Sequence, residues 1–488
     1  MNKLIIPIIV TVILAAGITG FFILQTPAFP EPSLIQKPKE DVSKDSPFAA
    51  NDFGIPSGVA KVFGITTKEQ MTREIETLQI PHFKELGIKW ARLHPLIFGT
   101  FGWSGVNPDH DGKNLDFSRQ DALVKLAQGN NIYLLPCISP LPTQEEMLFA
   151  QTYIPQDKEA YSSYIKQLIE RYDGDGKDDM PGLKYPIKYW QVENEPDLHN
   201  IVRRQRGNAN FSNPEEYFEV LKLTYQAVKE ADTEAKVMLN VVGIGQDKGD
   251  ASVNYLKKLE ELGAKDYYDI FSYHVYPDSY DISVLRDALQ NFKQFTGNKP
   301  IWITESGITS KMTVGKFKDA SERKQAAWVI KHYIFHRANG VGKIVWLSLT
   351  DMSPNIPEDI FKYSGLLTFK YSAPKLSYYT YKKMVEVLEG SDWDNIQKVQ
   401  ESDGVYIYKF TKSGKPIWVA WNDNTAEKQI TISGIVSNSV KITEAVPKYQ
   451  TGKEVTDYSA AFNTETKSVA NGKIMITLKD KPVFVEEK

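Results

Sequence analysis

Between about residues 53 and 389, apolar runs of strand length alternate with longer segments that have helical spacing. The runs are Val59–Ile65, Ile88–His94, Ile132–Ile138, Ile187–Val192, Lys236–Val242, Ile270–Val275, Ile301–Thr304 and Ile344–Leu349. The helical segments begin near Glu69, Ser118, Asp157, Asn213, Ser252, Asp281, Ala320 and Lys375. Repeated strand–helix units form a parallel sheet covered by helices. Eight such units predict an α/β fold of the (β/α)8 TIM barrel type.

A doubly wound α/β sheet is the alternative fold for repeated strand–helix units. Its usual signature is a Gly-rich phosphate-binding loop after the first strand. No such loop follows the first apolar run of this sequence. The number of units and this missing motif together favour the barrel.

The hydrophobic period changes to two after about Gly390. Short alternating runs then follow one another between turn residues, and no segment of helical spacing interrupts them. They are Val405–Tyr408, Ile417–Trp421, Gln429–Ile432, Val440–Ile442, Ile474–Leu478 and Pro482–Val485. We therefore expect residues 390–488 to form a small all-β sandwich behind a barrel of residues 53–389.

The N-terminal segment differs from both domains. Lys3 precedes an apolar run from Leu4 to Leu24 that contains no charged residue. This length suits a membrane-spanning helix better than the apolar part of a signal peptide. Residues 1–24 are thus predicted to be a membrane anchor or a signal segment, and residues 25–52 a Pro-rich linker. Either case predicts export, with the bulk of the chain outside the membrane.

Charge and cysteine content exclude some classes of protein. The formal net charge is only −3, which gives no electrostatic reason to expect a nucleic-acid partner. Cys137 is the one cysteine, so no intrachain disulfide can form. We predict neither a cofactor nor a metal site.

Two of the strand-like runs are each followed closely by a glutamate. Glu195 follows the fourth run and Glu305 follows the seventh. In a TIM barrel, the carboxyl ends of all strands open into one pocket, so both side chains would meet there. Two facing carboxyl groups are what glycosidic-bond cleavage requires, one as acid and one as nucleophile or base. The sequence therefore predicts Glu195 and Glu305 as a catalytic pair.

Several segments resemble the motifs of clan A of the glycoside hydrolases, in the same order along the chain. They are Lys89-Trp90-Ala91-Arg92 for strand two, Trp190-Gln191-Val192-Glu193-Asn194-Glu195-Pro196 for strand four, Ser272-Tyr273-His274-Val275-Tyr276-Pro277 for strand six, Thr304-Glu305-Ser306-Gly307 for strand seven and Trp346 for strand eight. The resemblance spans about residues 53–390. Families 39 and 5 are the most similar. The Asn213-Pro214-Glu215-Glu216-Tyr217 segment and the appended sandwich favour family 39.

The resemblance implies a role for each matching residue. It makes Glu195 the acid/base, Glu305 the nucleophile and Arg92 the cation beneath that nucleophile. Asn194 would bind the sugar 2-hydroxyl and Tyr276 would donate to Glu305. Further supporting residues are His274, which would orient hydroxyls or the Glu305 carboxylate, Trp346, which would form a sugar platform, and Trp103, which would either stack on a sugar or pin its loop.

One residue of the strand-four motif departs from many relatives. Glu193 stands where an aromatic residue is common, and it is the reserve candidate for the acid/base. The expected function is a retaining glycoside hydrolase that acts on β-linked oligo- or polysaccharides through a covalent glycosyl-enzyme intermediate. Two alternatives stay open: a catalytically inactive carbohydrate-binding protein on the same fold, and a transglycosylase that uses the same residues.

Overall fold

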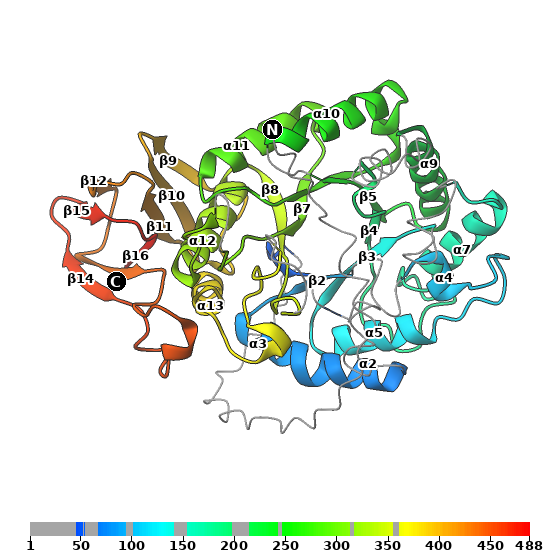
Figure 1. Ribbon diagram of the computed structural model, residues 1–488, viewed down its shortest axis with the longest axis horizontal. Helices are drawn as coiled ribbons and strands as arrows, with labels where there is room; N and C mark the ends of the chain where they lie inside the picture. Colours follow the sequence, from blue (N-terminus) through cyan, green and yellow to red (C-terminus); the bar gives the residue numbers. More distant parts are fainter. Residues whose placement is uncertain are drawn as a thin grey trace.

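The first domain is a closed barrel of eight parallel strands in sequential order (Figure 1). The computed structural model describes residues 45–51, 53, 67–93, 101–140, 154–197, 214–242, 246–312, 317–354 and 361–488. The barrel strands are β1 (Phe48–Ala50), β2 (Trp90–Leu93), β3 (Tyr133–Ile138), β4 (Tyr189–Val192), β5 (Lys236–Val242), β6 (Ile270–Val275), β7 (Ile301–Ser306) and β8 (Val341–Trp346). The predicted TIM barrel is confirmed.

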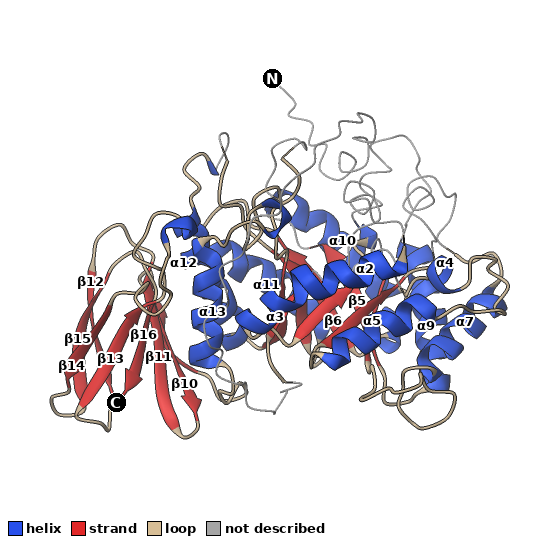
Figure 2. Ribbon diagram, turned by 90° about the horizontal axis from the view of Figure 1, so that it is seen from below, coloured by secondary structure: helices blue, strands red, loops and turns tan. Residues whose placement is uncertain are grey.

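Helices cover the outside of this barrel (Figures 1 and 2). They are α2 (Lys68–Glu74), a π-helical turn (Ile75–Gln79), α3 (Ile80–Leu86), α4 (Trp103–Val106), α5 (Ser118–Gly129), α7 (Lys158–Glu170), α9 (Pro214–Ala231), α10 (Gln246–Glu261), α11 (Ile282–Thr296), α12 (Glu322–Ala338) and α13 (Leu376–Leu388), with 3-10 turns at Ala264–Tyr267, Phe369–Tyr371 and Gly452–Glu454. Side chains of Asp157, Asp281 and Ser321 cap the N-termini of α7, α11 and α12. The local sequence thus fixes where these helices begin.

The first strand lies outside the predicted barrel range of 53–389. Phe48–Ala50 pairs with both β2 and β8, so the barrel begins inside the segment that we predicted to be linker. A three-residue strand of one aromatic and two alanines gives no apolar run, and Pro47 precedes it. The run Val59–Ile65, which we predicted to be the first strand, lies outside the described residues.

The predicted anchor, residues 1–24, also lies outside the described residues, and it stays a prediction. Within the part of the chain that the structure describes, no helix has the length and apolar character needed to cross a membrane.

Side chains alternate between the barrel interior and the helical layer. Ala49, Trp90, Leu135, Trp302 and Val345 belong to one buried cluster at the barrel centre. Their outward neighbours pack instead in the large cluster between strands and helices. This period of two decides which residues at the strand ends can reach the pocket.

The second domain contains antiparallel strands, as predicted. A six-stranded sheet has the order β14-β13-β16-β11-β10-β9, and β12 pairs with β15. The strands are β9 (Gln397–Ser402), β10 (Val405–Lys412), β11 (Lys415–Asn422), β12 (Lys428–Ser433), β13 (Ser439–Glu444), β14 (Thr464–Ser468), β15 (Lys473–Leu478) and β16 (Val483–Glu487). Strands β9 and β14 are additions to the prediction, because their largely exposed polar residues show no hydrophobic alternation.

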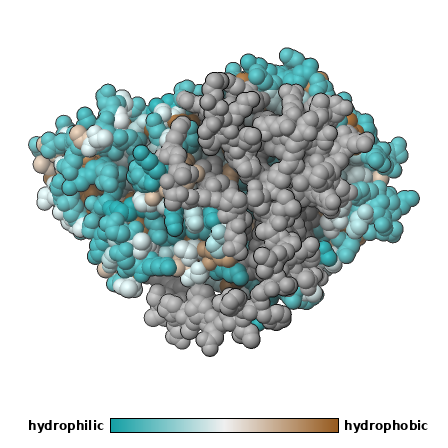
Figure 3. Space-filling model, viewed as in Figure 1, coloured by the Kyte–Doolittle hydropathy of each residue, from teal (hydrophilic) through white to brown (hydrophobic). Residues whose placement is uncertain are grey.

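The two faces of the larger sheet have different neighbours. Tyr408, Val419 and Trp421 belong to the same buried cluster as the barrel helices. Trp418 and Ala420 face the other way, into the core shared with β12 and β15. The face of the sandwich that is visible in Figure 3 is mostly hydrophilic. Tyr408 and Trp421 pack against the barrel, whereas Trp418 packs inside the sandwich.

Candidate active site

The predicted catalytic pair meets at the carboxyl ends of β4 and β7. One carboxylate oxygen each of Glu195 and Glu305, together with a ring nitrogen of His274, lie within 4.8 Å of one another. All three side chains are buried. The structure therefore brings together two carboxyl groups that are 110 positions apart in the sequence.

The Glu305 carboxylate accepts hydrogen bonds from three side chains, which lie in or directly after β1, β2 and β6. Arg92 Nη1 of β2 donates to Oε2 over 2.9 Å, and Asn51 Nδ2, just after β1, donates to the same oxygen over 3.2 Å. Tyr276 Oη donates to Oε1. Strands β6 and β7 shift register between Tyr273 and His274, and Glu305 then pairs with His274. Such an irregularity re-aims side chains, which explains how Glu305 points inward although it follows the inward-facing residue Thr304.

Arg92 is held in turn by residues of β4. Its Nε donates to Gln191 Oε1 over 3.0 Å and its Nη2 donates to Asn194 Oδ1 over 2.7 Å. The guanidinium group is fully buried, and its contacts with two amides and one carboxylate leave it rigid. The resemblance predicted a cation next to Glu305, and Arg92 contacts the Glu305 carboxylate.

Glu195 contacts His274 of β6 over 2.7 Å, between Oε1 and Nδ1. Burial lowers the pKa of His274 to about 3, so the imidazole is neutral at neutral pH. The backbone at Glu195 has a positive φ of 52°. Its N–H donates to Asn240 Oδ1 over 2.9 Å, which holds this left-handed turn in place.

Glu193 is buried near the ends of β3 and β4 and is hydrogen-bonded to Ser139. It also has a positive φ, of 63°, and its Oε1 accepts from Ser139 Oγ over 2.7 Å. Burial raises the pKa of its carboxyl group to about 8. Since its hydrogen bond to Ser139 joins the ends of β3 and β4, the geometry gives Glu193 a structural role.

This burial predicts a pH-dependent stability. The pKa of Glu193 rises from 4.5 to about 8 on folding, so the native state binds more protons between these pH values. The stabilisation is complete below pH 4.5 and is lost as the pH rises towards 8. Relative to Glu193→Gln, we expect the unfolding free energy of the wild type to fall by about 1.4 kcal/mol per pH unit in this window.

Urea unfolding of both proteins at several pH values measures this difference. Glu76→Gln is the matched control, because Glu76 is exposed on the barrel surface and its removal should leave the pH dependence unchanged. A constant difference between wild type and Glu193→Gln from pH 5 to 8 would contradict the raised pKa of Glu193.

The predicted sugar platform is wrong. Val345 points into the barrel, so the next residue of β8, Trp346, points to the helical layer. Its indole Nε1 donates to the Ser364 carbonyl oxygen over 3.1 Å, its ring packs near His332 of α12, and it is fully buried. The platform role was implied by the resemblance to clan A, and the alternation along β8 (Val341–Trp346) puts Trp346 on the outward face.

Trp103 pins its own loop, the second of its two predicted roles. The indole is buried, donates to Asn107 Oδ1 over 3.1 Å, and stacks on His110 with ring centroids 4.3 Å apart. Tyr161 contacts it edge-on. These contacts leave no face of the ring for a ligand.

Sequence reasoning missed three residues that support the pair: Asn51, Gln191 and Asn240. The Asn240 amide also donates to Ser272 and Thr304, over 3.2 Å each, so it links β4, β5, β6 and β7. Gln191 and Asn240 are polar residues at inward positions of otherwise apolar runs. A buried polar side chain needs a hydrogen-bond partner, so this pattern could have indicated both residues from the sequence. Asn51 had none, because its strand was not predicted.

In the described part of the chain, two groups of acidic or histidine side chains are close enough to surround an ion. The first is the catalytic cluster of Glu195, His274 and Glu305. The second is Asp173, Asp175 and Asp179, in the loop after α7. There Asp173 Oδ1 accepts from the N–H of Asp175, and Asp179 accepts from the N–H groups of two glycines, so the carboxylates already stabilise the turn. This loop gives no reason to assign a metal.

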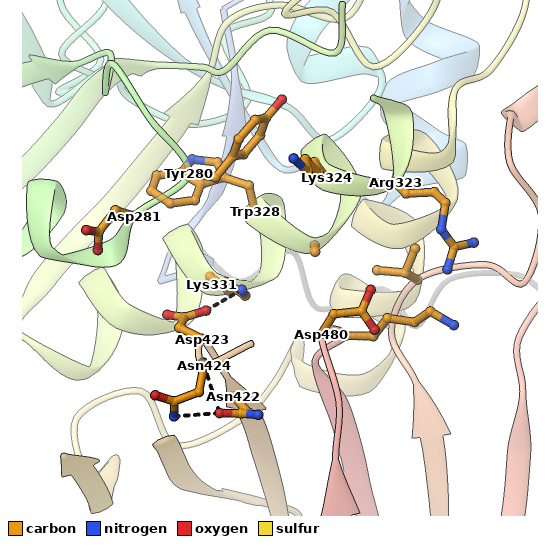
Figure 4. A pocket seen from close by; sticks show the side chains of 13 residues that line it. Tyr280, Asp281, Arg323, Lys324, Trp328, Lys331, Asn422, Asp423, Asn424 and Asp480 are labelled. Carbon is orange, nitrogen blue, oxygen red and sulfur yellow. Dashed lines mark hydrogen bonds and ion pairs between the residues drawn. The ribbon is translucent and has the colours of Figure 1, made fainter. Parts of the chain in front are cut away.

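A cavity of about 510 Å³ lies at the seam between the barrel and the sandwich (Figure 4). Tyr280, Trp328 and Lys331 line it from the barrel, and Asp423 and Asp480 line it from the sandwich. Lys331 and Asp423 form an ion pair across it. Since these charges neutralise each other, we interpret the cavity as part of the domain contact.

Comparison with known proteins decides the class of this barrel. Residues 171–370 match the family model described as glycosyl hydrolase catalytic core. The matched range contains Glu195, His274, Tyr276 and Glu305. The chain is therefore a glycosidase, as the sequence motifs predicted.

Solved structures share the architecture of this catalytic core at low sequence identity. A GH51 α-L-arabinofuranosidase from Thermotoga petrophila aligns with a TM-score of 0.59 and 12% identity, over 91% of this chain and 97% of that chain. A GH30 endoxylanase from Clostridium papyrosolvens aligns with a TM-score of 0.52 and 16% identity, over 85% and 93%. A glucosidase from Croceicoccus marinus aligns with a TM-score of 0.53 and 12% identity, over 83% and 91%.

These similarities concern the fold alone. No curated protein matches the sequence significantly. The assignment to family 39 or family 5 stays a prediction, since two of these structures belong to families 30 and 51.

Proposed function

We propose that this glycosidase retains the anomeric configuration of its substrate and cleaves β-linked oligo- or polysaccharides by double displacement. The observation that carries the proposal is the approach of Glu195 and Glu305, whose oxygens come within 4.8 Å. Retaining glycosidases place their two carboxyl groups about 5–5.5 Å apart, whereas inverting enzymes leave about 6.5–9.5 Å for a water molecule. The shorter separation favours direct attack by one carboxylate.

The surroundings of Glu305 support its role as nucleophile. Arg92, Asn51 and Tyr276 all donate hydrogen bonds to its oxygens, and donors of this kind stabilise the ionised form that must attack the anomeric carbon. They also fix the direction of attack. In this step the bond from Glu305 to the sugar forms as the bond to the leaving oxygen breaks.

The surroundings of Glu195 support its role as acid/base. In the first step Glu195 gives its proton to the leaving oxygen, and in the second it takes a proton from the water that attacks the glycosyl-enzyme. Neutral His274 orients the carboxyl group through Nδ1 without adding a permanent charge. Asn194 directly precedes Glu195 and accepts a hydrogen bond from Arg92, which also binds Glu305. We assign it the contact with the sugar 2-hydroxyl.

Two other functions are compatible with the residues of this site. A transglycosylase would use the same residues and differ only in the acceptor that takes the sugar. A catalytically inactive binding protein is disfavoured, because both carboxylates are present and each is oriented by polar partners.

The stereochemistry of the first product tests the proposal. The solved relatives in fold are named for glucose, xylose or arabinose linkages. The panel should therefore contain aryl β-glucosides, aryl β-xylosides and aryl α-L-arabinofuranosides. For the sugar that is cleaved, proton NMR should show a product with the configuration of the substrate before mutarotation. An initially inverted product would contradict the retaining mechanism, and a glycosylated alcohol formed with added acceptor would indicate transglycosylation.

A further inference from the structure

Asn51 is the first residue after β1 and is fixed from two sides. Its backbone N–H donates to the Trp346 carbonyl oxygen over 3.0 Å, which ties it to the end of β8. Its side-chain Nδ2 donates to Glu305 Oε2 over 3.2 Å, and the residue is 5% exposed. Both the backbone and the amide of Asn51 therefore have a defined orientation beside the nucleophile.

The other end of the same amide is unsatisfied. Asn51 Oδ1 is buried and has no hydrogen-bond partner among the residues that the structure describes. The orientation of the amide is not in question, because a carboxylate oxygen accepts and so must face the NH2 group. Buried acceptors without a donor are uncommon in native proteins and are costly, so this atom requires an explanation.

Among the described residues, the side chains that donate to Glu305 make no hydrogen bond to Asn51 Oδ1. Arg92 directs Nε, Nη1 and Nη2 to Gln191, Glu305 and Asn194. Tyr276 gives its one hydroxyl proton to Glu305. A donor for Asn51 Oδ1 is thus expected from a bound molecule next to the attacking oxygen, where the proposed function places the sugar ring.

We propose that Asn51 is a substrate-binding residue whose side-chain carbonyl oxygen accepts a hydrogen bond from a hydroxyl group of the sugar that Glu305 attacks. This inference rests on the proposed glycosidase function. An acceptor selects a free hydroxyl and disfavours a deoxy, O-methyl or O-acyl group at that position, because none of these can donate. Asn51 would then position the nucleophile and select the substrate with one amide group.

A mutant cycle between Asn51 and the substrate tests this role. The values of kcat/KM are measured for the best aryl glycoside and its monodeoxy analogues, with the wild type and with Asn51→Ala. In the wild type, we expect one monodeoxy analogue to lose about 10- to 100-fold through this contact. In Asn51→Ala the penalty for that one analogue should fall to within about threefold, while the penalties at other positions stay as they were.

Gln191→Met is the matched control. Gln191 acts on Glu305 only through Arg92, so this variant should lower the activity and preserve every deoxy penalty. Asn51→Ser replaces Asn51→Ala if the latter does not fold. If the loss in kcat/KM for every deoxy analogue were the same in the wild type and the Asn51 variant, the proposed substrate contact would be wrong. Asn51 would then only donate its hydrogen bond to Glu305. A wild type inactive on all aryl glycosides would instead contradict the proposed function, and this role with it.

Discussion

Replacing Glu305 by alanine should lower kcat by at least about 10⁴-fold on any substrate that the wild type cleaves. Removal of a nucleophile abolishes the covalent step, and losses of this order are typical when the central residue of a catalytic group is removed. The activity should fall with good and poor leaving groups alike, because attack on the anomeric carbon is needed for both. Initial rates with aryl glycosides of different leaving-group acidity measure this.

Azide then distinguishes a missing nucleophile from a damaged protein. The alanine side chain leaves space next to the anomeric carbon, and azide can attack from that face in place of Glu305. The expected product is a glycosyl azide of inverted configuration, identified by NMR. Rescue that yields an azide of retained configuration would contradict the assignment of Glu305 as nucleophile.

The fold of this variant needs its own measurement. Arg92 is fully buried and loses its carboxylate partner in Glu305→Ala, and an uncompensated buried charge typically costs about 3–5 kcal/mol. Glu305→Gln keeps acceptor capacity opposite Arg92 and serves as the milder variant. A folded Glu305→Gln protein with wild-type activity would exclude Glu305 from the chemistry.

Most of the barrel could be predicted because its strands are buried on both faces. Such strands appear as apolar runs, and β2 to β8 all begin within three residues of the predicted positions. Strand β1 contains only Phe48, Ala49 and Ala50, too short a run to stand out in a Pro-rich segment. Its pairing with β2 and β8 comes from barrel closure, a tertiary effect that no local pattern encodes.

The site was predictable in part for the same reason. Glu195, Glu305, Arg92, His274 and Tyr276 stand in motifs whose order matches the strands, and the structure brings all five together. The direction of a side chain, however, depends on the strand register to within one residue. The resemblance to clan A placed Trp346 in the pocket, but Val345 is the inward residue and Trp346, one position later, packs in the helical layer.

Replacing Glu195 by alanine should give losses that depend on the leaving group, unlike the loss expected for Glu305. An aryl glycoside with an acidic phenol needs little protonation, so its first step should remain fast. A substrate with a sugar or alkyl leaving group should lose about 10²- to 10⁴-fold, the usual contribution of general acid catalysis. Measured kcat/KM across a series of leaving groups should thus fall more steeply with leaving-group basicity in the variant than in the wild type.

The second step gives the complementary signature. Without Glu195 no base activates water, so the glycosyl-enzyme should accumulate and the reaction should show a burst of released phenol. Azide needs no base, and it should speed turnover and give a glycosyl azide of retained configuration, opposite to the product expected for Glu305→Ala. Glu193→Gln is the matched control, since Glu193 lies two residues away in the same motif and bonds to Ser139 rather than to the pair. If Glu193→Gln showed this leaving-group dependence and Glu195→Ala did not, the acid/base would be Glu193.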